Sequence, residues 1–132
     1  MNQKLSKSHI LSSKKDISQL FDKGQSIKSF PLLLVYLPKK DLDYDFQVSF
    51  SVSKKRFKTA VDRNYIKRLM REAFRKKKSS FTPLSNQRFL YMFIFIGKEM
   101  PNYTQIGALM DKLAEKLAIK ESFTSSTLHE TL

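Results

Sequence analysis

The chain has 132 residues, and its 41% share of hydrophobic residues with only three glycines and four prolines fits one compact domain. Its 25 Lys and Arg against 12 Asp and Glu give a formal net charge of +13, which favours a polyanionic partner, with nucleic acid ahead of an anionic membrane surface. The absence of cysteine excludes disulfides and thiolate metal sites, and no apolar run has the length of a membrane span or a signal peptide, so we expect a cytoplasmic protein.

The first half of the chain predicts one short helix and two strands. A capping box at Ser13 begins a helix whose apolar spacing continues to Gly24. Residues 30–37 are a continuous apolar run, and residues 46–52 alternate between apolar and polar side chains. The charged segment 38–45 between them is typical of a turn, so we expect the two strands to form a hairpin.

The second half predicts two helices on either side of a buried strand. A capping box at Thr59 begins a helix that reaches about Lys77, and a loop over residues 78–87 follows. Residues 88–96 are apolar on both sides, which indicates a buried core strand, and Asn102 caps a last amphipathic helix.

This order of elements predicts an α+β fold, with helices packed on a small, mostly antiparallel sheet. The order is helix, two strands with room for a third, helix, strand, helix. We expect a flexible basic N-terminus over residues 1–12, a folded domain over residues 13–120, and a disordered Ser/Thr-rich tail over residues 121–132.

The central helix separates an apolar side from a basic side. Between residues 54 and 78 there are twelve Lys and Arg against only Asp62 and Glu72. A helix face that merely contacts solvent normally mixes both signs of charge, so this face indicates a polyanion-binding surface more than a solvated one. At about 100° per residue, the basic side carries Arg63, Asn64, Lys67, Arg68, Arg71 and Arg75.

The stretch "SFSVSKKRFKTAVDRNYIKRLMREAFRK" resembles the signature of the protein subunit of bacterial ribonuclease P. That pattern is a strand ending in Ser-Lys-Lys followed by an Arg-Asn-x-x-Lys-Arg-x-x-Arg helix, which Arg63 to Arg71 match. The resemblance in layout extends from about Leu11 to Ile119. One departure is the turn before Ala60, where the family commonly has a glycine and this chain has Arg56, Phe57 and Lys58.

The resemblance implies an accessory protein of a catalytic RNA. In that family one protein assists a large RNA subunit, which uses Mg²⁺ to remove the 5′ leader of precursor tRNA, and the protein itself is expected to hold no cofactor. The family fold also implies a left-handed βαβ crossover, against the usual right-handed rule. The expected contacts with the catalytic RNA are Lys54, Lys55, Arg56, Lys58, Arg63, Asn64, Lys67, Arg68, Arg71 and Arg75. A cleft between the sheet and the first helix is expected to hold the single-stranded leader, lined by Ile17, Phe21, Tyr36, Ser49 and Ser51.

Simpler interpretations of individual residues stay open. Asn64 suits a 2′-hydroxyl contact because its amide donates and accepts, but it could also support the helix start. Phe21 and Ile17 could simply pin the first helix to the sheet. The aromatic stripe of residues 89–95 is interpreted as core.

Other function classes are weaker. Asp41, Asp43 and Asp45 alternate in a turn, which indicates a solvated loop more than a two-metal nuclease site. His9 and His129 lie in the expected tails, which argues against acid-base catalysis. A ribosome-associated RNA-binding protein would share the charge and size of this chain, and only the Arg-Asn-x-x-Lys-Arg-x-x-Arg helix after Ser-Lys-Lys distinguishes the two classes. DNA architectural binding is a third class, and it would need exposed apolar wedges.

Overall fold

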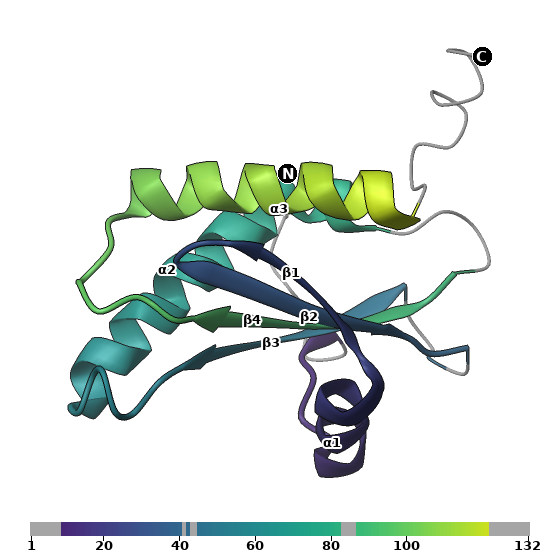
Figure 1. The fold of residues 1–132 in the computed structure, drawn as a ribbon, viewed down its shortest axis with the longest axis horizontal. Helices are drawn as coiled ribbons and strands as arrows, with labels where there is room; N and C mark the ends of the chain where they lie inside the picture. The colour runs from purple at the N-terminus through teal and green to yellow at the C-terminus, as the bar shows by residue number, and fades with distance from the viewer. Residues whose placement is uncertain (1–8, 41, 43–44, 83–86, 122–132) are drawn as a thin grey trace.

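The computed structural model describes residues 9–40, 42, 45–82 and 87–121, and it confirms an α+β fold. One four-stranded mixed sheet packs with three helices (Figure 1). The elements are α1 (Lys14–Lys23), β1 (Gln25–Ser29), β2 (Leu32–Pro38), β3 (Phe46–Val52), α2 (Ala60–Phe81), β4 (Phe89–Phe95) and α3 (Tyr103–Glu121).

The strand order is β1-β2-β4-β3, so the predicted hairpin of β2 and β3 is wrong. β4 lies between those two strands, antiparallel to β2 and parallel to β3. The physical reason is that β4 is apolar on both faces and therefore takes an interior position, while the alternating β3 takes an edge. The remaining strand, β1, pairs with the other edge of β2 and buries only Ile27.

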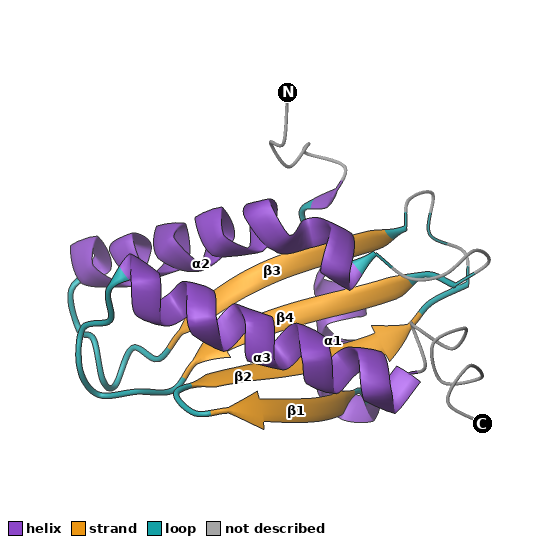
Figure 2. Ribbon diagram, turned by 90° about the horizontal axis from the view of Figure 1, so that it is seen from above, coloured by secondary structure: helices purple, strands orange, loops and turns teal. Residues whose placement is uncertain are grey.

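The β3-α2-β4 unit is a crossover between parallel neighbours. Figure 2 views the sheet from the side of α2 and α3, with β3 and β4 both pointing left and β4 drawn below β3. Because α2 passes over the near face between them, the crossover is left-handed, as the family resemblance implied and against the common rule.

Helices cover both faces of the sheet, and each face has its own core. α2 and α3 lie together on one face and α1 lies on the other (Figure 1). The larger core, under α2 and α3, is rich in aromatic rings, and Tyr91 and Phe93 of β4 are fully buried in it. The smaller core, under α1, consists of Leu11, Leu20, Val35, Leu90 and Met92, with partly buried neighbours.

Helix α2 begins where the sequence predicts and ends one turn later. The Thr59 hydroxyl accepts a hydrogen bond of 3.3 Å from the Asp62 backbone N–H, as the capping box predicted. The helix continues beyond Lys77 to Phe81, because the fully buried Phe81 ring packs against Phe74 and so extends the apolar side by another turn.

The N-terminal boundary of the fold also differs from the prediction. Leu11 is buried in the smaller core, and its backbone N–H donates a 2.8 Å hydrogen bond to the Val48 carbonyl. Residues 9–12, expected in the flexible N-terminus, therefore pack against β3. At the other end, Glu121 completes α3, and the rest of the expected tail lies outside the described residues. Within the part of the chain that is described, no helix has the length and apolar character needed to cross a membrane.

Candidate nucleic-acid interface

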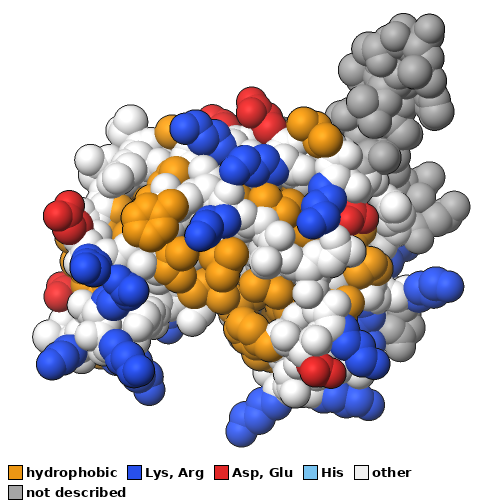
Figure 3. Space-filling model, viewed as in Figure 1, with side chains coloured by type: hydrophobic (Ala, Val, Ile, Leu, Met, Phe, Trp, Pro, Cys, Tyr) orange, Lys and Arg blue, Asp and Glu red, His pale blue; other side chains and the backbone are white. Residues whose placement is uncertain are grey.

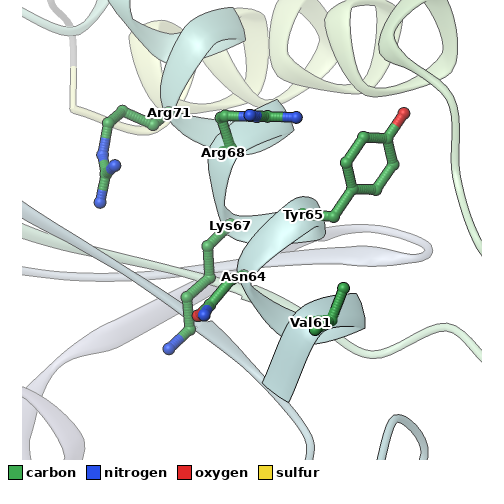
Figure 4. A pocket seen from close by; sticks show the side chains of 6 residues that line it. All are labelled: Val61, Asn64, Tyr65, Lys67, Arg68 and Arg71. Atoms are coloured by element: carbon green, nitrogen blue, oxygen red, sulfur yellow. The ribbon is translucent and has the colours of Figure 1, made fainter. Parts of the chain in front are cut away.

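The outward face of α2 carries the basic stripe, which we define as Asn64, Lys67, Arg68 and Arg71. Its opposite side packs on β3 and α3 and buries Ile66 and Met70 completely. A shallow hollow of about 520 Å³ lies over the stripe and is also lined by Val61 and Tyr65 (Figure 4). The sequence therefore placed these side chains correctly, on one exposed side of one rigid helix.

The three cations of the basic stripe have no acidic partners among the described residues. The Arg68 guanidinium lies over the Tyr65 ring, with 5.6 Å to the centroid, and the Arg71 guanidinium lies over the Phe50 ring at 5.9 Å. Asn64 likewise makes no side-chain hydrogen bond within this part of the chain. Uncompensated charge held on a rigid element creates a strong local positive potential, which suits a polyanion.

Further along α2, two of the cations are paired within the protein. Arg75 contacts Glu72 at 2.7 Å, and Lys77 contacts Asp111 of α3 at 2.7 Å. Arg75 was predicted as an RNA contact, and its ion pair separates it from the basic stripe. Arg75 and Lys77 are thus neutralised within the protein, unlike the cations of the basic stripe.

Arg63 has a structural role that the sequence did not reveal. Its guanidinium Nη1 donates hydrogen bonds to the carbonyls of Phe57 and Lys58, at 2.8 and 2.9 Å. The Phe57 side chain is buried against Phe95, with 5.9 Å between ring centroids. This aromatic anchor and the Arg63 clamp fix the turn in which the family commonly has a glycine.

The turn before α2 adds a second group of cations beside the basic stripe. Its basic side chains are exposed and follow β3 directly into the start of α2. They are Lys54, Lys55, Arg56 and Lys58, all four predicted as RNA contacts.

The face of the sheet that carries α1 is only partly covered. α1 packs mainly over β2 and β4, so the polar side of β3, including Ser49 and Ser51, is left half-buried. Ile17 packs partly on the smaller core, whereas the Phe21 ring is 55% exposed. Figure 3 shows the lower surface hollowed between the projections formed by α1 and by the start of α2.

Tyr36 does not belong to this face, which corrects the predicted cleft. Its side chain is fully buried in the larger core, and its hydroxyl donates a 2.7 Å hydrogen bond to the Glu121 carboxylate. Burial, followed by this hydrogen bond, raises the pKa of Tyr36 well above its usual range. Because successive strand residues face opposite sides, Val35 and Leu37 occupy the α1 side in its place.

Tyr65 and Val61 were missed as site residues. Both side chains are large and apolar, yet Tyr65 is 39% exposed and Val61 is 78% exposed. Both line the hollow over the basic stripe. The signal in the sequence was their spacing of four residues, which stacks them on one side of a helix next to Arg68.

Of the groups considered for nuclease chemistry, the structure describes only Asp45 and His9. Asp45 pairs with Arg88 at 3.7 Å, while Asp41 and Asp43 lie outside the described residues, as does His129. His9 packs against the Phe46 ring at 4.7 Å between centroids, and burial, then the nearby Lys78 charge, lower its pKa. Among the described residues, no three His, Cys, Asp or Glu side chains come close enough to hold a metal ion.

Comparison with known proteins points to one family. The family model described as Ribonuclease P matches residues 5–118. The chain is 33% identical over 122 residues to the ribonuclease P protein component of Porphyromonas gingivalis strain W83, and the match covers 86% of each chain. It is 31% identical over 131 residues to the ribonuclease P protein component of Chlorobium phaeobacteroides, and this match covers 89% of this chain and 90% of the relative. The structure of the Staphylococcus aureus RNase P protein superposes with a TM-score of 0.68 at 27% identity, covering 83% of this chain and 94% of that one.

Proposed function

The chain belongs to the ribonuclease P protein family, and from that premise we propose that it binds a catalytic RNA and the 5′ leader of precursor tRNA. In this role it assists endonucleolytic removal of the leader in the cytoplasm. The hydrolytic step, with its Mg²⁺, belongs to the RNA subunit. One protein per RNA is the expected assembly.

The observation that carries this proposal is the unpaired basic stripe of α2. Three cations and an amide share one side of a helix whose other side is fixed in the core, while Arg75 and Lys77 farther along are paired with acidic side chains. Leaving like charges uncompensated costs folding stability, and a polyanion partner offsets that cost. Binding also releases counterions from the phosphates, which is favourable at cellular salt.

A folded RNA fits this surface better than sequence-read DNA. The deep, narrow major groove of an RNA helix excludes side chains, so recognition uses phosphates, 2′-hydroxyls and shape. Arg68 and Arg71 can each donate several hydrogen bonds to a phosphate, and the Asn64 amide can both donate to and accept from a 2′-hydroxyl.

The open face beside α1 is the proposed leader surface. A single strand needs a groove with flat apolar faces for stacking and small polar groups that leave room for the chain. Phe21 offers the exposed ring, and Ser49 and Ser51 on β3 offer the small polar side chains. The depression between α1 and the start of α2 in Figure 3 borders this face, so a single RNA strand can contact both.

We expect the protein to stimulate leader release when it is mixed with its cognate catalytic RNA at low Mg²⁺. At low Mg²⁺ the RNA lacks enough cations to hold its substrate, and the basic stripe supplies fixed positive charge in their place. The measurement is the rate of appearance of the free leader from end-labelled precursor tRNA, with and without protein.

The controls in this assay decide between the function classes. RNA alone at high Mg²⁺ shows that the RNA is competent, and protein alone should release no leader. Absence of stimulation, or cleavage by the protein without RNA, would contradict the proposal.

Replacing Phe21 with Ala should weaken binding of precursor tRNA to the assembled complex by roughly 5- to 100-fold and leave mature tRNA binding unchanged. The reason is that only the precursor carries a leader to stack on the exposed ring. The matched control is Phe30→Ala, which removes another exposed ring, 65% accessible, in the β1–β2 turn. Equal weakening for precursor and mature tRNA would refute the leader role of Phe21.

A further inference from the structure

The hollow over the basic stripe combines two kinds of side chain that phosphate binding alone does not require. Phosphates need cations and hydrogen-bond donors, and Lys67, Arg68 and Arg71 provide them. Val61 and Tyr65 provide exposed apolar area in the same hollow, although a helix that binds only a charged backbone gains nothing from them. The apolar pair therefore calls for a ligand with a flat, apolar part.

The side chains are arranged in two rows with the hollow between them. Figure 4 shows Tyr65 and Arg68 extending to one side of α2 and Asn64 and Lys67 extending to the other, with Val61 one turn before Tyr65. The volume of about 520 Å³ lies within the range of small-ligand sites. The opening is wide, so a ligand that is part of a longer chain can enter and leave it.

We propose that this hollow binds one unpaired nucleotide of the RNA partner, with its base stacked on Tyr65 and its phosphate held by the cations of the basic stripe. This inference rests on the proposed RNA-binding function and adds the chemical class of the contact. An unpaired nucleotide has both parts that the site requires, a π-face and an adjacent anion. In a regular duplex the base faces are already stacked and are not available to the ring.

Arg68 prepares the ring for this contact. Its guanidinium lies 5.6 Å from the Tyr65 centroid, within the distance of a cation–π interaction, and so restrains the orientation of the ring. The gap is too narrow for a base to enter between the two groups, so the base stacks on ring surface that Arg68 leaves exposed. Tyr65 is 39% exposed, which leaves such surface available.

The test compares Tyr65→Leu with Tyr65→Phe in the full-length protein. Affinity for the cognate catalytic RNA is measured at several salt concentrations, giving a midpoint affinity and a slope of log K against log salt. Tyr65→Leu should weaken binding by roughly 5- to 100-fold, because it keeps apolar bulk but removes the flat ring, while Tyr65→Phe should stay within about twofold of the wild type. The slope should be unchanged, because stacking releases no counterions.

The slope separates stacking from an indirect effect through Arg68. If Tyr65 served only to orient Arg68, Tyr65→Leu would lose a phosphate contact. The magnitude of the slope would then fall by about one unit, which would overturn the inference. Thermal unfolding of each variant checks that the exposed substitution leaves the fold intact.

A second probe identifies the ligand as an unpaired nucleotide. Tyr65→Leu should bind a fully paired RNA duplex as tightly as the wild type does, but should bind the same duplex with a single-stranded extension more weakly. Equal binding of Tyr65→Leu and wild type to every RNA, with Lys67→Ala still lowering affinity and slope, would reject stacking and leave the proposed function standing. If Lys67→Ala also had no effect, both proposals would fail.

Discussion

Replacing Lys67, Arg68 and Arg71 together with Ala should weaken binding to the catalytic RNA on the order of several hundredfold at about 0.1 M salt. Each phosphate contact releases close to one counterion, which contributes about 0.9 decades of affinity at that salt concentration, and three contacts are removed. The slope of log K against log salt should fall by roughly two to three units. The measurement is equilibrium binding of labelled RNA over a salt series.

The matched control removes the same amount of charge elsewhere. The control removes three exposed lysines that are not part of α2. Lys98 lies in the loop before α3, and Lys112 and Lys120 lie on α3. Either triple substitution lowers the net charge of +13 by three, so a general attraction to RNA would be affected equally. We expect the α3-side triple variant to keep most of its affinity and slope. Similar losses in both variants would show that the basic stripe is not the interface.

Local patterns predicted the helices and the basic stripe because those features depend on short-range chemistry. The capping hydroxyls of Ser13 and Thr59 bond the backbone three residues later, as the sequence indicated. The basic and apolar sides of α2 follow from the geometry of one helix, with no information needed about the rest of the fold. The aromatic stripe of β4 was likewise placed in the core correctly, since no amphipathic alternative fits a strand that is apolar on both sides.

Long-range pairing was the part that local patterns could not predict. The segment between β2 and β3 looks like a hairpin turn. If β2 and β3 paired with each other, however, the apolar β4 would become an edge strand and would lack a neighbouring strand on one side. The doubly buried β4 gains more from the interior position, and β3 is displaced to the edge of the sheet. The left-handed crossover depends in addition on the face of the sheet that α2 covers, and only the family resemblance anticipated it.

The two corrections at single residues have different physical causes. Tyr36 was assigned to the wrong face because strand residues alternate, so an error of one position reverses the side. Arg63 was placed on the correct side of α2, yet its guanidinium bonds inward to the carbonyls of the preceding turn. Charge patterns show where a cation is attached, whereas the partner of its long side chain depends on which backbone groups the fold brings within reach.

Arg63 and Phe57 also connect the turn to the position of the basic stripe. The turn carries exposed cations. Its conformation is fixed by the Phe57 ring, which is buried against Phe95, and by the Arg63 guanidinium, which donates a hydrogen bond to the Phe57 carbonyl. These two contacts hold the basic turn close to the start of α2. The proposed RNA surface is therefore a property of the β3–α2 junction as well as of the helix.

Replacing Phe74 with Ala should produce the largest loss of stability, about 3–5 kcal/mol, because this fully buried ring joins the inner side of α2 to the sheet. It packs against the rings of Phe46, Phe50, Phe81, Tyr91 and Phe93. A loss of this size is a large part of the stability of a small domain and should lower the melting temperature by at least about 10 °C. Ile119→Ala, which truncates an apolar side chain that is 71% exposed, is the control and should change stability by less than about 0.5 kcal/mol.

The same variant tests whether the basic stripe depends on the core beneath it. Only the folded protein presents the stripe on a rigid helix, so saturating catalytic RNA should raise the melting temperature of Phe74→Ala and shift it toward the folded state by mass action. At a temperature where the variant remains folded, its salt slope should equal that of the wild type, because every stripe cation is still present. A reduced slope in the folded variant would mean that the Phe74 ring also sets the positions of the stripe side chains, and not only the stability of α2.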